Sequence, residues 1–309
     1  MSYFSQKDEM TKRATEHNEE MERLFSDYTK YSIENTKIYD PTISSVNKDP
    51  TSADVNIYFS TSNSMDCINI DLRGLSHGEN WEKAAVLNFA SYKNPGGMYI
   101  EGSSAQEESL CHGTNLYQLL KEFPDYYKYN KQNLMSGLYT NRALFSPKII
   151  TDWENDKPTA FTNIITCAAP NKRAFLRNAV RGDNKEEAIN TNNLAVYSRV
   201  KFIIDICDLN KIEYLVAGAY GTGVFCQDTA VVADAFKKAI ESSINLKAVW
   251  FPLMSDGQKY FIMSDILNNK ISRRNKDAYC TSSSDHNVCY NILHYDTVYD
   301  VYSTLYDVN

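Results

Sequence analysis

The sequence lacks several features that define whole classes of protein. No window approaches about 18 consecutive apolar residues, which excludes a transmembrane helix. No two of its seven cysteines form a Cys-x-x-Cys motif, and an odd, scattered set is typical of reduced thiols in a cytosolic-type compartment. With only 12 glycines and 8 prolines in 309 residues, the chain is neither collagen-like nor of low complexity.

Positive charge is also scarce. Lysine and arginine total 32 against 39 aspartates and glutamates, so the formal net charge is -7. A non-specific nucleic-acid binder is normally basic, so the acidic balance argues against that class. We also expect no direct, sequence-specific nucleic-acid partner. A locally positive pocket for a phosphate is still compatible with this composition. Residues 1–28 are charged and lack the apolar core of a signal peptide. We therefore expect a cytoplasmic protein with no membrane partner.

Strand-like and helix-like segments alternate along the chain. Short apolar runs occupy residues 55–59, 67–72, 86–89, 161–167, 214–218 and 248–253. Helical spacing predicts helices over residues 8–30, 106–123, 185–209, 228–242 and 260–267. The helix at 228–242 has Asp228 as a suitable N-cap, and Pro124 is expected to end the helix at 106–123. This alternation predicts an α/β domain with a mostly parallel sheet.

The composition changes after about Ser272. Residues 273–309 are polar and rich in tyrosine, so we expect a main domain over residues 1–272 followed by a C-terminal appendage. Two cysteines and two histidines cluster in the appendage, namely Cys280, His286, Cys289 and His294. Their spacing matches no standard zinc site, so we expect no metal ion there.

Half of the glycines fall in two short windows. The first window, with Gly96, Gly97 and Gly102, is followed by Gln106-Glu107-Glu108 at the start of a predicted helix. A glycine loop brings backbone amides close to a phosphate or ribose, and a helix N-terminus stabilises carboxylate charge. Adjacent side chains on a helix point in different directions, so the two glutamates are expected to have different roles. The alternative is an ordinary acidic first turn on a surface helix.

The second window, Gly218-Ala219-Tyr220-Gly221-Thr222-Gly223-Val224-Phe225, lies between a predicted strand and a predicted helix. Backbone amides there, together with the helix N-terminus, would suit a diphosphate. The order of residues is neither that of a dinucleotide-binding loop nor that of a P-loop, and a tight turn is the alternative. Both loops follow strands, which places them at the carboxyl edge of a parallel sheet, where ligands bind.

These residues resemble the signature of the microbial-type poly(ADP-ribose) glycohydrolases. The resemblance runs from Val86-Leu87-Asn88-Phe89-Ala90-Ser91 through Gly96-Gly97 to Gln106-Glu107-Glu108-Ser109-Leu110-Cys111, and includes the second glycine loop. Leu144-Phe145-Ser146-Pro147 and Thr166-Cys167-Ala168-Ala169-Pro170-Asn171 are similar to intervening family segments. The resemblance implies a three-layer α/β/α, macrodomain-like mixed sheet with an N-terminal helical extension.

The resemblance also implies an activity, namely hydrolysis of ribose–ribose O-glycosidic bonds in poly(ADP-ribose), which releases ADP-ribose from the chain end. It makes Glu108 the catalytic acid and base and Glu107 the residue that orients the riboses. It places the remaining substrate contacts at Asn88, Ser91, Gly96, Gly97, Gln106, Gly218, Gly221, Thr222, Gly223, Val224 and Phe225. Cleavage through an oxocarbenium-like ribose needs acid, base and electrostatic support, so neither a metal nor a cofactor is expected.

Two positions depart from the family pattern and leave alternatives open. Met98 stands where the family has a third glycine, and Ser91 stands where its animal-type branch has asparagine. They motivate a second reading, a macrodomain that binds ADP-ribose without cutting it. A third reading is a hydrolase of mono-ADP-ribosyl linkages on protein or nucleic acid. The expected partners are poly(ADP-ribose) or ADP-ribosylated protein, with ADP-ribose as product.

Overall fold

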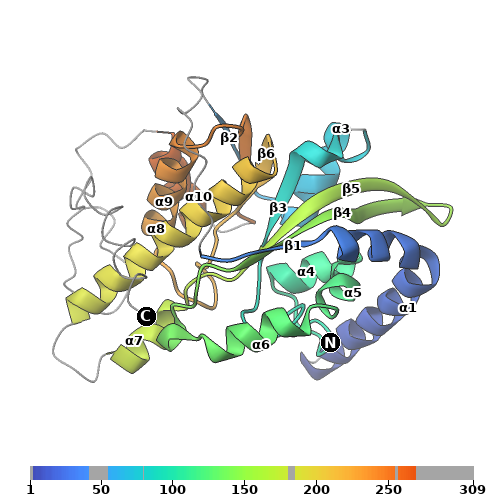
Figure 1. The fold of residues 1–309 in the computed structure, drawn as a ribbon, viewed down its shortest axis with the longest axis horizontal. Coiled ribbons are helices and arrows are strands. Elements are labelled where there is room, and N and C mark those ends of the chain that lie inside the picture. Colours follow the sequence, from blue (N-terminus) through green and yellow to red (C-terminus); the bar gives the residue numbers. More distant parts are fainter. Residues whose placement is uncertain (1–2, 42–54, 79, 180–184, 255–256, 269–309) are drawn as a thin grey trace. The chain divides into compact units, whose positions relative to one another are not determined.

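A seven-stranded mixed sheet forms the centre of the described residues (Figure 1). The computed structural model describes residues 3–41, 55–78, 80–179, 185–254 and 257–268. The strand order is β1-β4-β5-β3-β6-β7-β2. Strands β5, β3, β6, β7 and β2 run parallel, whereas β4 is antiparallel to both of its neighbours. The bounds are β1 (Lys37–Tyr39), β2 (Asn56–Ser60), β3 (Ala84–Phe89), β4 (Ala143–Glu154), β5 (Lys157–Cys167), β6 (Tyr214–Val216) and β7 (Ala248–Pro252).

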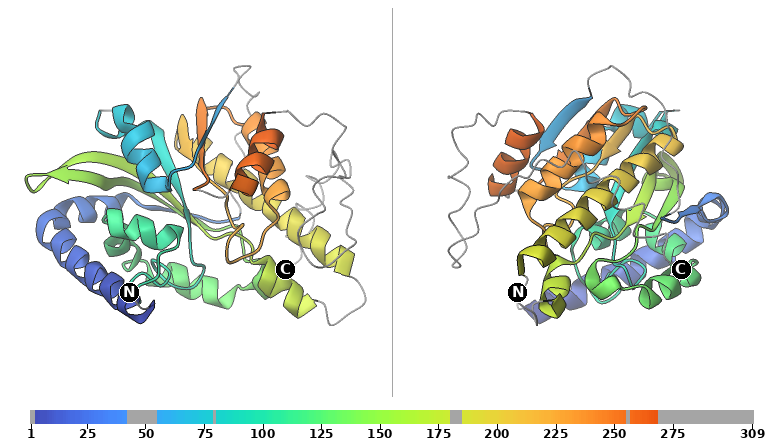
Figure 2. Two further views of the ribbon diagram at one scale, coloured as in Figure 1. Left: turned by 180° about the vertical axis from the view of Figure 1, so that it is seen from behind. Right: turned by 60° about the vertical axis from the view of Figure 1, so that its left-hand side comes forward.

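Helices cover both faces of this sheet, which confirms the predicted three-layer α/β/α class (Figures 1 and 2). On β3, Ala85 and Leu87 pack with the helices of one face, and Val86 packs with those of the other. The first face is covered by α8 (Lys185–Leu209), α9 (Thr229–Glu241) and α10 (Gly257–Leu267). The second is covered by α4 (Gln106–Gly113), α5 (Leu116–Leu120) and α6 (Pro124–Gln132). Such alternation is what a strand buried on both faces requires.

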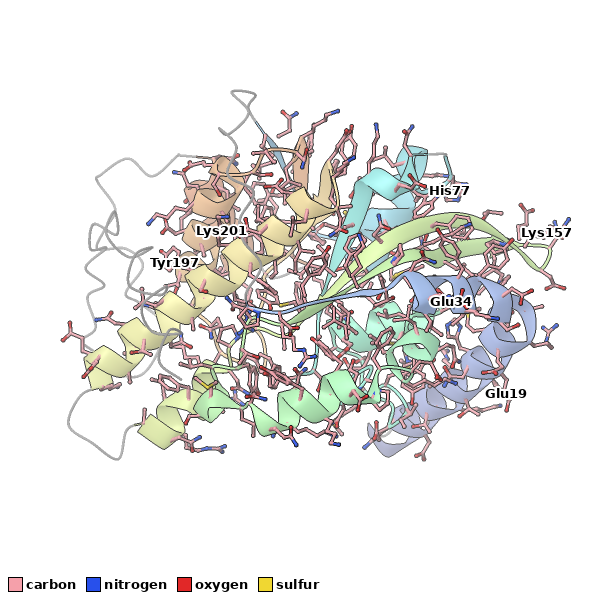
Figure 3. All side chains as sticks on the ribbon, viewed as in Figure 1. Glu19, Glu34, His77, Lys157, Tyr197 and Lys201 are labelled. Carbon is pink, nitrogen blue, oxygen red and sulfur yellow. The ribbon has the colours of Figure 1, made fainter. Side chains whose placement is uncertain are left out.

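The N-terminal helix α1 (Tyr3–Asn35) is longer than the predicted 8–30 and is kinked at Phe25. Met21 and Phe25 are fully buried against Ile150 of β4, so this helix is part of the second helical layer. Its outer face carries exposed glutamates such as Glu19 and Glu34 (Figure 3). No helix in the described ranges has both the length and the apolar character to cross a membrane.

The predicted helix over residues 106–123 is wrong as one element. It is divided into α4 and α5 because Thr114 adopts an extended conformation (φ -149°, ψ 173°). The Thr114 hydroxyl donates to Leu110 O and accepts from Leu116 N–H, which replaces helical hydrogen bonds. Pro124 does not simply end a helix, since it lies at the first position of α6, where its missing N–H costs nothing.

Short elements complete the described chain. They are α2 (Ser64–Asp66), a π-helical turn (Cys67–Asp71), α3 (Arg73–Ser76), α7 (Lys172–Ala179) and two 3₁₀ turns (Trp81–Lys83 and Met135–Gly137). The apolar run at 67–72 is thus helical, with Cys67 and Ile68 buried. The division at Ser272 and the Cys280–His294 cluster lie outside the described residues, so both stay predictions.

The topology places both glycine loops at one edge of the sheet. Strands β3 and β6 are parallel neighbours, and Ala84 pairs with Tyr214 and Val86 with Val216. The first loop follows β3 and the second follows β6, so both begin at the carboxyl edge. The parallel pairing of β3 with β6 therefore brings together the two glycine loops, which lie more than a hundred residues apart in the sequence.

Candidate active site

Glu107 lies in the first turn of α4 and is almost fully buried, with 3% of its surface exposed. Its Oε2 accepts a hydrogen bond from Ser91 N–H (2.6 Å), and its Oε1 accepts one from the Asn88 side-chain amide (3.3 Å). Burial raises the pKa of Glu107 to about 8, although these hydrogen bonds oppose the shift. At neutral pH the carboxyl group is therefore mostly protonated and held in place by β3 and the loop after it.

Glu108 is held differently. Its Oε1 accepts a hydrogen bond from Met98 N–H (3.0 Å). Its Oε2 has no hydrogen-bond partner among the described residues and is not among the buried unpaired atoms. One oxygen is thus fixed by the first glycine loop, and the other is free to exchange a proton with a bound molecule. Of the two glutamates, Glu108 has the geometry of a proton donor and acceptor.

Gln106 joins α4 to β3. Its side-chain Oε1 accepts from Phe89 N–H (2.8 Å), and its Nε2 donates to Leu87 O (3.0 Å) and to Ser64 Oγ (3.2 Å). The amide is thus fully engaged within the protein. Its expected place along the ribose and phosphate path stays a prediction, whereas its structural role is to fix the start of the helix that carries both glutamates.

The first glycine loop needs glycine at positions 96, 97 and 102, where φ is positive. A Cβ at Gly96 would lie 2.7 Å from the Tyr117 ring, and one at Gly102 would lie 2.5 Å from Lys7 O of α1. Ser91 Oγ accepts from Asn94 N–H (3.2 Å), which fixes the start of the loop. The loop is therefore clamped between α1, α4 and α5.

Met98, which departs from the family pattern, does not adopt a glycine conformation. Among the described residues it is absent from those with positive φ, and 52% of its side chain is exposed. Its backbone N–H still reaches Glu108. The substitution of glycine by methionine here consequently strains neither the loop nor the contact with the carboxylate.

The second glycine loop presents backbone N–H groups. Within the described part of the chain, no acceptor pairs with the N–H groups of Gly221, Gly223, Val224 or Phe225. The N–H of Thr222 instead donates to Ala219 O (3.2 Å), as does its hydroxyl. Successive unpaired N–H groups form a concave site for an anion. Three of the four amides predicted to bind a diphosphate, those of Gly221, Gly223 and Val224, are thus unpaired within the described residues. Their contact with a diphosphate stays a prediction.

Phe89, the last residue of β3, lies between the second glycine loop and the start of α4. A Cβ at Gly218 would lie 2.9 Å from the Phe89 ring, while Phe89 N–H binds Gln106. Gly221 is equally confined, because its Cβ would lie 2.7 Å from Ala169 Cβ. All thirteen predicted site residues are described, and they lie on or beside these two loops. Their contacts with substrate stay predictions.

Aromatic residues beside the second loop were not found from the sequence. The Phe225 ring lies 6.2 Å from that of Tyr139, which stacks on Tyr92 at 4.0 Å. Phe225 O accepts from Arg173 N–H (3.2 Å), so the start of α7 lies next to this loop. With 22 tyrosines in the chain, composition carries no signal for these two.

Arg199 of α8 is a further residue that the sequence analysis missed. It is 1% exposed, and its guanidinium donates to Asn141 Oδ1 (2.7 Å), Leu138 O (3.3 Å) and Ala168 O. It forms no ion pair with a carboxylate of the described residues. The Arg199 guanidinium thus connects residues 138–141 with Ala168, and both segments lie next to the candidate site.

Comparison with known proteins agrees with this geometry. Residues 6–151 match the family model for the microbial-type PARG, catalytic domain, where PARG is poly(ADP-ribose) glycohydrolase. The match contains α1, the first glycine loop and both glutamates, and it ends within β4. No curated protein matches the chain.

Solved structures extend the likeness over most of the chain. A poly(ADP-ribose) glycohydrolase from Thermomonospora curvata is 22% identical, with a TM-score of 0.70 over 84% of this chain and 99% of that one. A glycohydrolase from Deinococcus radiodurans, solved in complex with ADP-ribose, is 26% identical, with a TM-score of 0.65 over 78% of this chain and 97% of that one. The fold shared with these structures therefore continues past residue 151.

Proposed function

We propose that the chain is a poly(ADP-ribose) glycohydrolase that cleaves the ribose–ribose O-glycosidic bond and releases ADP-ribose. The observation that carries this proposal is the carboxylate of Glu108, fixed through one oxygen by Met98 N–H and free at the other. The family match over residues 6–151 supports it, as does the ADP-ribose complex of the Deinococcus radiodurans enzyme.

The reaction needs two proton transfers, one from Glu108 to the leaving group and one from water to Glu108. Glu108 Oε2 protonates the 2′-oxygen of the leaving ribose as the bond from that oxygen to the anomeric carbon breaks. The resulting oxocarbenium-like ribose is stabilised by the carboxylate that has just lost its proton. Water then attacks the anomeric carbon, and Glu108 takes a proton from it. One carboxylate therefore does the work that a pair does in most glycosidases.

Glu107 is the orienting residue in this mechanism. Since its pKa is about 8, it is mostly uncharged at neutral pH and does not repel the charge on Glu108. Glu107 is fixed beside Gly97 of the first glycine loop, a position that suits hydrogen bonds to the ribose hydroxyls of the substrate. Asn88 and Ser91 hold Glu107 directly, so their contribution is to position this carboxyl group.

The diphosphate of the terminal unit binds to the unpaired N–H groups of Gly221, Gly223 and Val224, with Phe225 against the ribose. A loop that surrounds the last diphosphate favours cleavage from the chain end. Poly(ADP-ribose) or ADP-ribosylated protein is the substrate partner, in the cytoplasm. The residues named here supply all the acid, base and binding groups that this mechanism uses.

The test is incubation of the purified chain with automodified poly(ADP-ribose), with released ADP-ribose followed by chromatography. We expect release by the wild type and a loss of about 10³-fold or more in Glu108→Gln, because general acid–base catalysis contributes that much. Glu122→Gln, at an exposed position, is the matched control and should keep full activity. Full activity in Glu108→Gln would refute the mechanism.

The same assay separates the rival functions. A binding module would bind ADP-ribose but release none, with wild type and Glu108→Gln alike. The structure weakens the reasons for that reading, because Met98 strains nothing and Ser91 N–H contributes to the site through its backbone. A panel with mono-ADP-ribosylated protein and nucleic acid identifies the linkage.

A further inference from the structure

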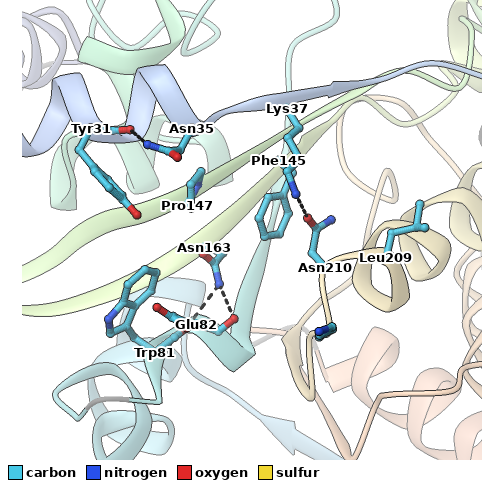
Figure 4. A pocket seen from close by; sticks show the side chains of 11 residues that line it. Tyr31, Asn35, Lys37, Trp81, Glu82, Phe145, Pro147, Asn163, Leu209 and Asn210 are labelled. Carbon is cyan, nitrogen blue, oxygen red and sulfur yellow. Dashed lines mark hydrogen bonds between the residues drawn. The ribbon is translucent and has the colours of Figure 1, made fainter.

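A cavity of about 370 Å³ lies at the other end of the parallel strands (Figure 4). Its walls come from α1, β1, β4, β5 and the turns that precede β3 and β6. Asn163, which lines it, pairs with Ala85 near the amino end of β3, whereas Phe89 at the carboxyl end adjoins the glutamates. At about 3.3 Å per residue, roughly 13 Å of strand separates the two levels. The cavity is therefore distinct from the candidate active site.

One end of the cavity is aromatic. Figure 4 shows Tyr31 and Trp81 there, with Glu82 beside Trp81. Tyr31 is 44% exposed, and Lys148 Nζ lies 5.0 Å from the centre of its ring. The Phe161 ring contacts Trp81, with ring centres 6.0 Å apart and ring planes tilted by 53°. Supported and accessible aromatic faces stack nucleic-acid bases without regard to sequence.

The other end is basic. Lys37 and Lys211 line it, and Lys37 Nζ donates to the neutral Asn210 side chain at 3.1 Å. Neither lysine pairs with a carboxylate of the described residues. In a chain with a net charge of -7, two unpaired cations at one cavity make a local site for phosphate.

We infer that this rear cavity binds an adenine nucleotide unit, with the base at Tyr31 and Trp81 and the phosphates at Lys37 and Lys211. Its volume lies within the range of small-molecule sites. Glu82, the acidic residue of the lining, is at the aromatic end, where its carboxylate accepts a hydrogen bond from the amino group of adenine. The acidic residue of the lining thus lies beside the proposed base, and Lys37 and Lys211 lie beside the proposed phosphates.

The source of this unit is an internal ADP-ribose of the polymer whose end is cut at the opposite edge of the sheet. This part of the inference rests on the proposed function. A polymer bound at the rear cavity keeps its free end near the catalytic site, which raises the effective concentration of that end. This gain needs no additional contact at the catalytic site. Long chains should therefore be bound more tightly than short ones.

The first experiment locates the site without using the reaction. The intact Glu108→Gln variant is photolabelled with 8-azido-ADP, and the modified peptides are mapped. We expect label on the segments that contain Tyr31 and Trp81, reduced by poly(ADP-ribose) and by ADP. The absence of label from both segments would overturn the inference, whether or not the wild type hydrolyses the polymer. Equal protection by poly(A) would assign the cavity to RNA instead and would overturn the polymer assignment.

The second experiment measures chain-length dependence in the active protein. For the double variant Lys37→Ala/Lys211→Ala we expect KM for long polymers to rise about 10-fold. The kcat, and the KM for an ADP-ribose dimer, should not change. The matched control is Lys12→Ala/Lys157→Ala, which removes the same charge at exposed positions, one of them at the tip of the β4–β5 hairpin (Figure 3). An unchanged KM for long polymers, together with ADP-protected labelling, would assign the cavity to free nucleotide and overturn the polymer as its source.

Discussion

Gly97 and Glu108 are packed so closely that a Cβ added to Gly97 would lie 2.6 Å from Glu108 Oε1. The same Cβ would lie 3.1 Å from Glu107 Oε2, and φ at Gly97 is +63°. The missing side chain thus leaves the space in which both carboxylates approach the loop. Glu108, the proposed acid and base, can occupy its position only because Gly97 has no side chain.

Gly97→Ala should therefore damage catalysis more than folding. The strained φ costs about 1–3 kcal/mol, and displacement of the Glu108 carboxylate by about 1 Å should lower kcat about 100-fold. Steady-state hydrolysis of poly(ADP-ribose) and urea unfolding measure the two effects. Gly74→Ala is the control, since no atom lies within 4 Å of its added Cβ. Equal kcat in the two variants would contradict the prediction.

The burial of Glu107 predicts how stability varies with pH. Its pKa is raised from 4.5 to about 8, so the folded protein holds the proton more tightly than the unfolded chain. The resulting contribution to stability is complete below about pH 4.5 and is lost as the pH rises through about 8. Glu107→Gln has no such proton, so its free energy of unfolding should fall less steeply across this window, by up to about 1.4 kcal/mol per pH unit. Urea unfolding at several pH values tests this, and parallel curves for the two proteins would refute it.

Gln106→Glu tests the link between α4 and β3. The new carboxylate keeps an acceptor for Phe89 N–H but places an oxygen against Leu87 O, where the amide now donates at 3.0 Å. An unpaired buried group costs about 1–3 kcal/mol, and we expect that loss in the free energy of unfolding together with lower kcat. Gln132→Glu makes the same chemical change at the exposed end of α6 and should have no effect. Identical unfolding curves for the two variants would show that the link is dispensable.

Two glycines of the second loop should respond differently to alanine. Gly221 has φ of +74° and no room for a Cβ, so Gly221→Ala should distort the loop and weaken ADP-ribose binding about 10-fold or more. Gly223 is not among the residues with positive φ, and no protein atom lies within 4 Å of its added Cβ. Gly223→Ala should therefore keep the stability of the wild type. Calorimetric titration with ADP-ribose and thermal unfolding compare the two, and a stable, fully binding Gly221→Ala would contradict the anion site.

Two long helices on one face of the sheet, α8 and α9, could be predicted from the sequence almost to the residue. The predicted helix over 185–209 is α8, and Asp228 caps α9 by accepting from Ala230 N–H. β4 could not be found in this way, because Pro147 and the positive φ of Lys148 interrupt its pattern. Pairing with β5 through irregular register forms this strand, and a single sequence does not display such pairing.

The candidate site residues could be selected from residue types, whereas the contacts that hold them in place could not. The spacing of the two glutamates and the glycine loops can be recognised in the sequence. The parallel pairing of β3 with β6 then brings the two loops to one edge of the sheet. The engagement of Gln106 by β3 and the buried guanidinium of Arg199 depend on partners distant in sequence. Such contacts have no local signal, since a glutamine or an arginine in a helix is most often exposed.

The order of strands also determines when the candidate active site can form during synthesis. β3 is hydrogen-bonded to β5 on one side and to β6 on the other, and both follow residue 151 in the chain. A nascent chain of 151 residues already contains both glutamates but neither neighbour of the strand that supports them. The centre of the sheet, and with it the candidate active site, can therefore form only after β6 and its glycine loop have left the ribosome.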